Sequence, residues 1–254
     1  MPRKPREKSN SGIYHIMLRG INQQSIFEDT EDYSKFIEFL EKYKPICQYK
    51  VFAYCLMSNH IHLLLKIENI DLDLTMKRLA GSYAHWYNWK YYRVGHLFQD
   101  RFKSEPVEDD AYFLTVLRYI HQNPIKAGLV EQLEAYSFCS YFDYFCEESN
   151  IVDMDFAFSM LDKDEFVMFN NEKNEDICLE LDFTKTNIND IDAKKMIKRI
   201  TGCISVTEFQ SLPKEQREIY IHKMKESGIS LRQISRLTGT SFYSARKILE
   251  NSSF

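Results

Sequence analysis

Residues 59–65 read NHIHLLL and hold two histidines that are separated by one residue. Successive side chains of a β-strand point to opposite faces, so His60 and His62 would project to the same side. Two imidazoles placed in this way can share one metal ion. The alternative is a pair of half-buried histidines with local hydrogen bonds, and the isolated pair leaves both interpretations open.

A second polar cluster, RYIHQN at residues 118–123, falls within a predicted helix. Tyr119 and Asn123 are four residues apart and therefore share a helical face. A tyrosine hydroxyl can act as a covalent nucleophile. From the spacing alone, an ordinary core tyrosine and an asparagine that ends a helix before Pro124 are the favoured interpretations. His121 points to another side of the helix, where packing or DNA contact is favoured over acid–base chemistry.

Bringing these clusters together requires a sheet with a helix packed against it. Patterns typical of strands and of helices alternate along the first half of the chain. The predicted strands are 13–18, 49–56, 60–67 and 101–107, and the predicted helices are 31–43, 74–91 and 109–127. Their order predicts an α+β fold with a ferredoxin-like antiparallel sheet, packed helices and one extra helix at its end.

Charge is distributed unevenly along the 254 residues, whose formal net charge is −4. Residues 147–192 carry a net charge of −11, and residues 194–250 carry +7. Zones of this kind allow a basic binding face on a mildly acidic chain. We therefore predict three parts: a catalytic domain at 1–145, an acidic linker with short helices at 146–193, and a helical domain at 194–254.

The C-terminal part has the pattern of a DNA-binding helical unit. Helices are predicted at 214–228, 230–237 and 241–249, with the apolar spacing of a helix-turn-helix core. The third helix would face DNA with Ser241, Tyr243, Arg246 and Lys247. A small helical bundle that contacts protein remains the alternative.

Composition excludes several classes of protein. Six cysteines occur without a CxxC pair, and the polar, basic N-terminus does not look like a secretion signal, so disulfides are not expected. No stretch reaches about 18 consecutive apolar residues, so no membrane span is expected. The predicted location is therefore the cytoplasm.

Together the motifs resemble a known family, the REP-associated tyrosine transposases, within the single-tyrosine HUH transposases. The resemblance is carried by MSNHIHLLL and LRYIHQNPIKAGLV, and LRGINQQSIF, GHLFQDRFKS and the basic MPRKPR start follow the same order over residues 1–145. It implies that Tyr119 is the nucleophile and that His60, His62 and Asn123 are metal ligands. Related transposases often carry Gln at the position of Asn123. The DNA contacts that we expect in this part of the chain, from its basic arm and from the resemblance, are Arg3, Lys4, Arg6, Arg19, Asn22, Arg101, Lys103 and His121.

The implied activity is a DNA transposase and endonuclease that acts on single-stranded, hairpin-associated DNA. Tyr119 would form a 5′-phosphotyrosyl intermediate with the help of Mg²⁺ or Mn²⁺, and the free 3′-hydroxyl would later rejoin DNA. The expected setting is bacterial and associated with the nucleoid, and the family leaves monomer and homodimer open. The alternatives are a catalytically silent DNA-binding regulator and a phosphodiesterase that uses water.

Overall fold

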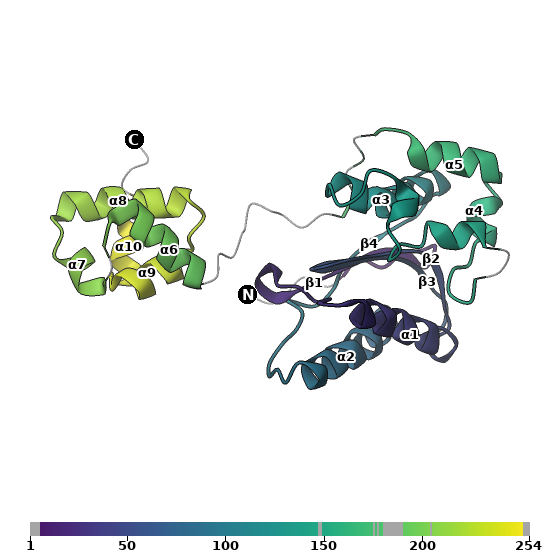
Figure 1. The fold of residues 1–254 in the computed structure, drawn as a ribbon, viewed down its shortest axis with the longest axis horizontal. Coiled ribbons are helices and arrows are strands. Elements are labelled where there is room, and N and C mark those ends of the chain that lie inside the picture. The colour runs from purple at the N-terminus through teal and green to yellow at the C-terminus, as the bar shows by residue number, and fades with distance from the viewer. Residues whose placement is uncertain are drawn as a thin grey trace. The chain divides into compact units, whose positions relative to one another are not determined.

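The computed structural model describes residues 6–146, 149–174, 176, 178, 179, 190–203 and 205–250. The chain divides into two compact units, Met1–Glu180 and Leu181–Phe254 (Figure 1). Each unit is considered by itself below.

A four-stranded sheet forms the centre of the first unit. Its strands are β1 (Ile13–Arg19), β2 (Tyr49–Met57), β3 (His60–Ile67) and β4 (Lys103–Pro106). They lie in the order β2-β3-β1-β4, and every neighbouring pair is antiparallel. This is the strand order of a ferredoxin-like sheet, so the predicted α+β fold is confirmed, although β4 is shorter than predicted.

Helices cover both faces of this sheet (Figure 1). On one side lie α1 (Thr30–Cys47) and α2 (Leu72–Lys90), and on the other lie α3 (Asp110–Lys126), α4 (Asp155–Phe158) and α5 (Lys163–Asn171). Short 3₁₀ helices, η1 (Ile21–Gln23), η2 (Leu133–Ala135) and η3 (Phe142–Phe145), connect these elements. The predicted extra helix is therefore α3, and it lies across the sheet from α1 and α2.

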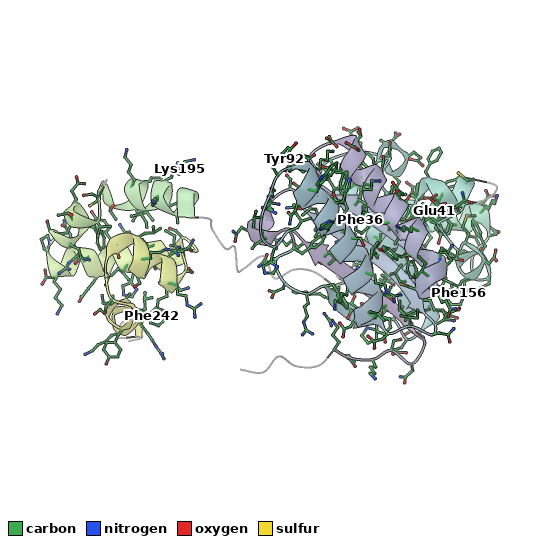
Figure 2. The ribbon with its side chains drawn as sticks, turned by 90° about the horizontal axis from the view of Figure 1, so that it is seen from below. Phe36, Glu41, Tyr92, Phe156, Lys195 and Phe242 are labelled. Carbon is green, nitrogen blue, oxygen red and sulfur yellow. The ribbon has the colours of Figure 1, made fainter. Side chains whose placement is uncertain are left out.

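The core beneath α1 and α2 is almost entirely apolar. Phe36 of α1 is fully buried, and its ring packs edge-on against the ring of Tyr83 of α2. Ile61, Leu63 and Leu65 alternate along β3 with the histidines and are also fully buried. Figure 2 looks onto this layer, in which Phe36 is internal, whereas Tyr92 projects from the end of α2.

The chain after residue 145 does not leave the first unit at once. The structure places α4 and α5 within Met1–Glu180, and α5 packs against α3. Phe166 of α5 stacks on Tyr144, and Asn170 is fully buried. This division differs from the sequence-based boundary at 145, because helices that were assigned to an acidic linker bury an aromatic face. Part of that predicted linker lies outside the described residues.

The described residues of the second unit form helices and the loops that join them. It contains α6 (Asp190–Thr201), α7 (Val206–Gln210), α8 (Lys214–Glu226), α9 (Leu231–Thr238) and α10 (Phe242–Glu250) around a core that includes Ile221, Ile234 and Ala245. Among the described residues, no helix is both long and apolar enough to cross a membrane.

Candidate active site

The strand register determines which side chains share a face with the two histidines. In the pairing of β1 with β3, Met17 lies opposite His62, and Arg19 lies opposite His60. Since paired residues of antiparallel strands point to the same face, His60 and His62 share theirs with His15, two residues before Met17. This is the face that α3 covers.

A chain of hydrogen bonds crosses three strands on this face. Nδ1 of His15 lies 2.9 Å from Oε1 of Glu105 on β4, and Nε2 of His15 lies 3.0 Å from Nδ1 of His62. The Glu105 oxygen also accepts the Tyr112 hydroxyl at 2.8 Å and the backbone N–H of Leu179 at 2.9 Å. Glu105, His15 and His62 are therefore linked from β4 through β1 to β3.

Helix α3 brings the second polar cluster to the same place. It begins after Asp109, whose side chain caps it by accepting the N–H of Tyr112. The Tyr119 ring then packs edge-on against two imidazoles, with centroid distances of 5.6 Å to His62 and 5.8 Å to His15. Asn123 follows one turn later, close enough to His60 for its side chain to raise the pKa of that ring. The residues predicted from two distant motifs thus meet between α3 and the sheet.

Burial keeps the imidazoles of this cluster neutral. Desolvation lowers the pKa of His60 to about 4, although its hydrogen bond with Asn123 acts in the opposite direction. Desolvation, together with the neighbouring His15 and His60, places the pKa of His62 well below the usual histidine range. Burial also lowers the pKa of His15. A metal requires neutral imidazole ligands, so the charge state suits one.

The set of donor atoms fits a divalent cation. The rings of His60 and His62 are 5.1 Å apart between centroids, and Nδ1 of each ring already has a hydrogen-bond partner, Asn59 for His60 and His15 for His62. Within the described part of the chain, no three His, Cys, Asp or Glu side chains are grouped to hold a metal. The third ligand that the family resemblance implies is the amide of Asn123.

Comparisons with known proteins identify the family of this chain. The family model described as "Transposase IS200 like" matches residues 8–123. A putative REP-associated tyrosine transposase of Haemophilus influenzae is 30% identical over 150 residues, which cover 54% of this chain and 83% of that protein. The chain belongs to this transposase family.

The fold of the transposase is likewise similar to a solved structure. That structure is described as a REP-associated tyrosine transposase bound to a REP hairpin; it has a TM-score of 0.51 and 17% sequence identity. The match covers 58% of this chain and 87% of that one, and at this identity it bears on the fold alone.

Tyr119 of the transposase is buried, with only 4% of its surface exposed. The chain after α5 lies along α3. Gln122 donates to the carbonyl oxygens of Asn170 and Glu172, and Arg118 donates to the carboxylates of Glu172 and Asp176. The helix that carries the tyrosine is thus held on both sides, by the sheet and by this segment.

The predicted DNA contacts of the first unit have different environments. Asn22, Arg101 and Lys103 are exposed, and Arg19 is half-buried. Arg6 is already engaged, because its guanidinium hydrogen-bonds Asp73 and stacks 3.7 Å from the centre of the Phe102 ring. Arg3 and Lys4 lie outside the described residues.

The predicted DNA contact of His121 does not agree with its position. The ring is 1% exposed and lies 2.8 Å from Oδ1 of Asn170 and 3.1 Å from the hydroxyl of Ser140. Tyr141, Tyr144 and Phe166 surround it. The structure therefore corrects that assignment to packing of α3 against α5 and its neighbours.

The second unit presents the predicted helix-turn-helix residues. Ser230 caps α9 in a capping box with Gln233, and Gly239 ends α9 in the left-handed region at φ 70°. A Cβ at Gly239 would come within 2.7 Å of Val206, so this turn favours glycine. After the turn, Ser241, Tyr243, Arg246 and Lys247 are all exposed, and Phe242 also projects outward (Figure 2).

Two residues of the site, His15 and Glu105, escaped the sequence analysis. No motif singled out His15, and Glu105 lay within the predicted strand 101–107 without any motif of its own. The sequence held one usable signal. Alternate residues of a strand point to the same face, so pairing β1 with β3 places His15 either on the face of His60 and His62 or on the opposite face.

Proposed function

We propose that this transposase cleaves and rejoins single-stranded DNA next to hairpins, through a covalent bond between Tyr119 and a 5′-phosphate. The observation that carries the proposal is the packing of the Tyr119 ring against His62, on the helix that also brings Asn123 to His60. The residues proposed as nucleophile and as metal ligands come from separate motifs and adjoin one another in a member of a transposase family.

His60, His62 and Asn123 would hold one divalent cation, Mg²⁺ or Mn²⁺, and imidazole ligands suit Mn²⁺ better. Such an ion would supply positive charge that neutralises and orients the scissile phosphate. The ring nitrogens of the two histidines and the amide oxygen of Asn123 are the groups of this chain that would face it.

Tyr119 would attack the phosphorus with its hydroxyl oxygen, in line with the leaving 3′-oxygen. The Tyr119 O–P bond forms, the P–O3′ bond breaks, the phenol gives up its proton, and the leaving 3′-oxygen takes one up. The energy of the phosphodiester stays in the phosphotyrosyl bond, so a 3′-hydroxyl can later reverse the step and join new ends without ATP.

The experiment that tests this mechanism uses 5′- and 3′-labelled single-stranded oligonucleotides from the DNA that flanks the gene. The full chain is incubated with them, with and without Mn²⁺, beside Tyr119→Phe. A Mn²⁺-dependent adduct that keeps the DNA 3′ of the cut and disappears in the variant is expected. Cleavage that persists in Tyr119→Phe would contradict the tyrosine and favour attack by water.

The second unit supports a further binding role, contact with duplex DNA through α10. Its support is the left-handed turn at Gly239 followed by an exposed helix that carries Lys247. A helix after such a turn can enter the major groove. This role would also serve a catalytically silent regulator, which is the alternative function.

Lys247→Ala in the full chain separates the two roles. We expect it to weaken duplex binding and to lower the slope of log affinity against log salt by about one, because one phosphate contact is lost. Adduct formation at Tyr119 on single strands should stay unchanged. Duplex binding equal to that of the unsubstituted chain would contradict the DNA-binding role of α10, and duplex binding without any adduct would favour the regulator.

A further inference from the structure

The hydrogen-bond chain from Glu105 to His62 goes beyond the residues of the family motif. Glu105 lies directly opposite His15 in the pairing of β1 with β4, and His15 lies diagonally from His62 in the pairing of β1 with β3. The sheet therefore holds one carboxylate and two imidazoles in a row across three adjacent strands. His15 is fully buried and His62 is 1% exposed, so water has little access to the links between them.

The donors of the chain follow from the chemistry of its first member. A carboxylate can only accept hydrogen bonds, so the proton between Glu105 and His15 is on Nδ1 of His15. A neutral imidazole carries one N–H, which makes Nε2 of His15 an acceptor. The proton between His15 and His62 must then be on Nδ1 of His62. Nε2 of His62 is left with its lone pair, which is the form that a metal ligand needs.

We propose that Glu105 and His15 are positioning residues that fix His62 in its Nδ1–H tautomer and orient it as a metal ligand. This inference rests on the proposed function, because it assigns these residues a role toward the cation. Outer hydrogen-bond partners of this kind orient metal-bound histidines, and their loss typically costs about 10- to 100-fold in metal affinity.

The acceptor oxygen of Glu105 determines the direction of the chain. Tyr112 and Leu179 both donate to the same oxygen as His15, so the surroundings of Glu105 supply donors only. In Glu105→Leu no acceptor remains for Nδ1 of His15, so that ring is free to carry its proton on Nε2 and to donate to His62. His62 would then carry its own proton on Nε2, where it blocks the metal. His60 serves as an internal comparison, because its Nδ1 is 2.7 Å from Oδ1 of the neighbouring Asn59 and does not depend on Glu105.

The first measurement reads the tautomer directly in the metal-free, unsubstituted full chain. Long-range ¹H–¹⁵N NMR of ¹⁵N-histidine-labelled protein, assigned with His62→Gln, distinguishes a protonated Nδ1 from a protonated Nε2. We expect Nδ1–H for His62. An Nε2–H tautomer would overturn the inference, whether or not the chain cleaves DNA.

The second measurement is Mn²⁺ affinity by calorimetry for the unsubstituted chain, Glu105→Leu, His60→Ala and the control Asp110→Asn, which removes an exposed carboxylate at the start of α3. We expect binding that is about tenfold or more weaker in Glu105→Leu, lost in His60→Ala and unchanged in Asp110→Asn. Equal affinity of Glu105→Leu and the unsubstituted chain would overturn the positioning role but leave His60 and His62 as ligands. No Mn²⁺ binding by the unsubstituted chain would instead overturn the metal in the proposed function, and the positioning role with it.

Discussion

The two faces of the four-stranded sheet differ in how many polar side chains they bury. Beneath α1 and α2 the buried residues are nearly all apolar, with Phe36 and Leu63 among them. Beneath α3 the sheet buries His15 and His62, and α3 itself adds Asn123 to its own buried apolar residues. Apolar burial stabilises a fold by about 25 cal/mol per Å², whereas each buried polar group costs about 1–3 kcal/mol if it loses its partner. Both faces thus supply stability, and the face under α3 uses some of it to keep polar groups in fixed positions.

The sharpest test of this division removes one hydroxyl from the polar face. Tyr119→Phe should lower the yield of covalent DNA adduct on the order of 10³-fold or more, because no other group replaces the nucleophile. Its melting temperature should stay close to that of the unsubstituted chain, since the ring keeps its packing. Tyr92→Phe, at a tyrosine that is 97% exposed, is the matched control and should retain the adduct. A loss of adduct in both variants would contradict the assignment.

The complementary test removes a large buried side chain from the apolar layer beneath α1 and α2. Phe36→Ala should lower the free energy of unfolding by about 3–5 kcal/mol, because it leaves a cavity where the ring packs against Phe27 and Tyr83. Urea denaturation followed by circular dichroism measures this change. Adduct formation per folded molecule should remain. Trp89→Ala removes a ring that is 72% exposed and should have little effect on stability. If Phe36→Ala and Trp89→Ala lowered the free energy of unfolding by similar amounts, the buried layer under α1 and α2 would not be a main source of stability.

A third test uses pH to find the energetic cost of burying one polar ring of α3, His121, between α3 and α5. Burial lowers the pKa of His121 to about 4, below the value of about 6.5 in an unfolded chain. The stability that depends on this neutral ring is therefore present above about pH 6.5 and is lost as the pH falls toward about 4. The loss is about 1.4 kcal/mol per pH unit for one such group.

His121→Asn should accordingly reduce the slope of unfolding free energy between pH 6.5 and 4 by about one proton. The measurement is a set of urea curves at several pH values. His85→Asn, at an exposed position on α2, is the control and should keep the original slope. An unchanged slope in His121→Asn would show that this ring is accessible to protons in the folded chain.

The smallest expected effect concerns the outer side of α3. Arg118→Ala removes the ion pairs with Glu172 and Asp176 and should lower the free energy of unfolding by about 1 kcal/mol. The value is small because the Glu172 side chain is 66% exposed and water screens the pair. Lys35→Ala breaks an exposed pair with Glu38 and should cost less. Equal effects would mean that the segment after α5 contributes nothing to holding α3.

Local patterns in the sequence predicted much of this arrangement. The alternation in HIHLLL placed His60 and His62 on one face, and the helical spacing placed Tyr119 and Asn123 together; both patterns act over a few residues. The pairing of His15 with Glu105 could not be predicted, because it depends on the register between β1 and a short strand far along the chain.

The extent of the first unit was missed for a related reason. The net acidity of residues 147–192 resembled a solvated linker, but Phe166 and Asn170 are buried against the helix that carries Tyr119. The composition of a segment gives only its average polarity. Whether the nine-residue helix α5 packs against α3 depends on which few of its side chains share one face.

Under the proposed mechanism, the burial of Tyr119 makes substrate affinity a product of two equilibria. Since Tyr119 is 4% exposed, the proposed attack on a phosphate requires a conformation in which this residue is more open. The measured dissociation constant then equals the intrinsic one divided by the fraction of open molecules. A substitution that destabilises the closed form without touching DNA would therefore tighten DNA binding, and affinity for DNA would rise as the resting protein becomes less stable.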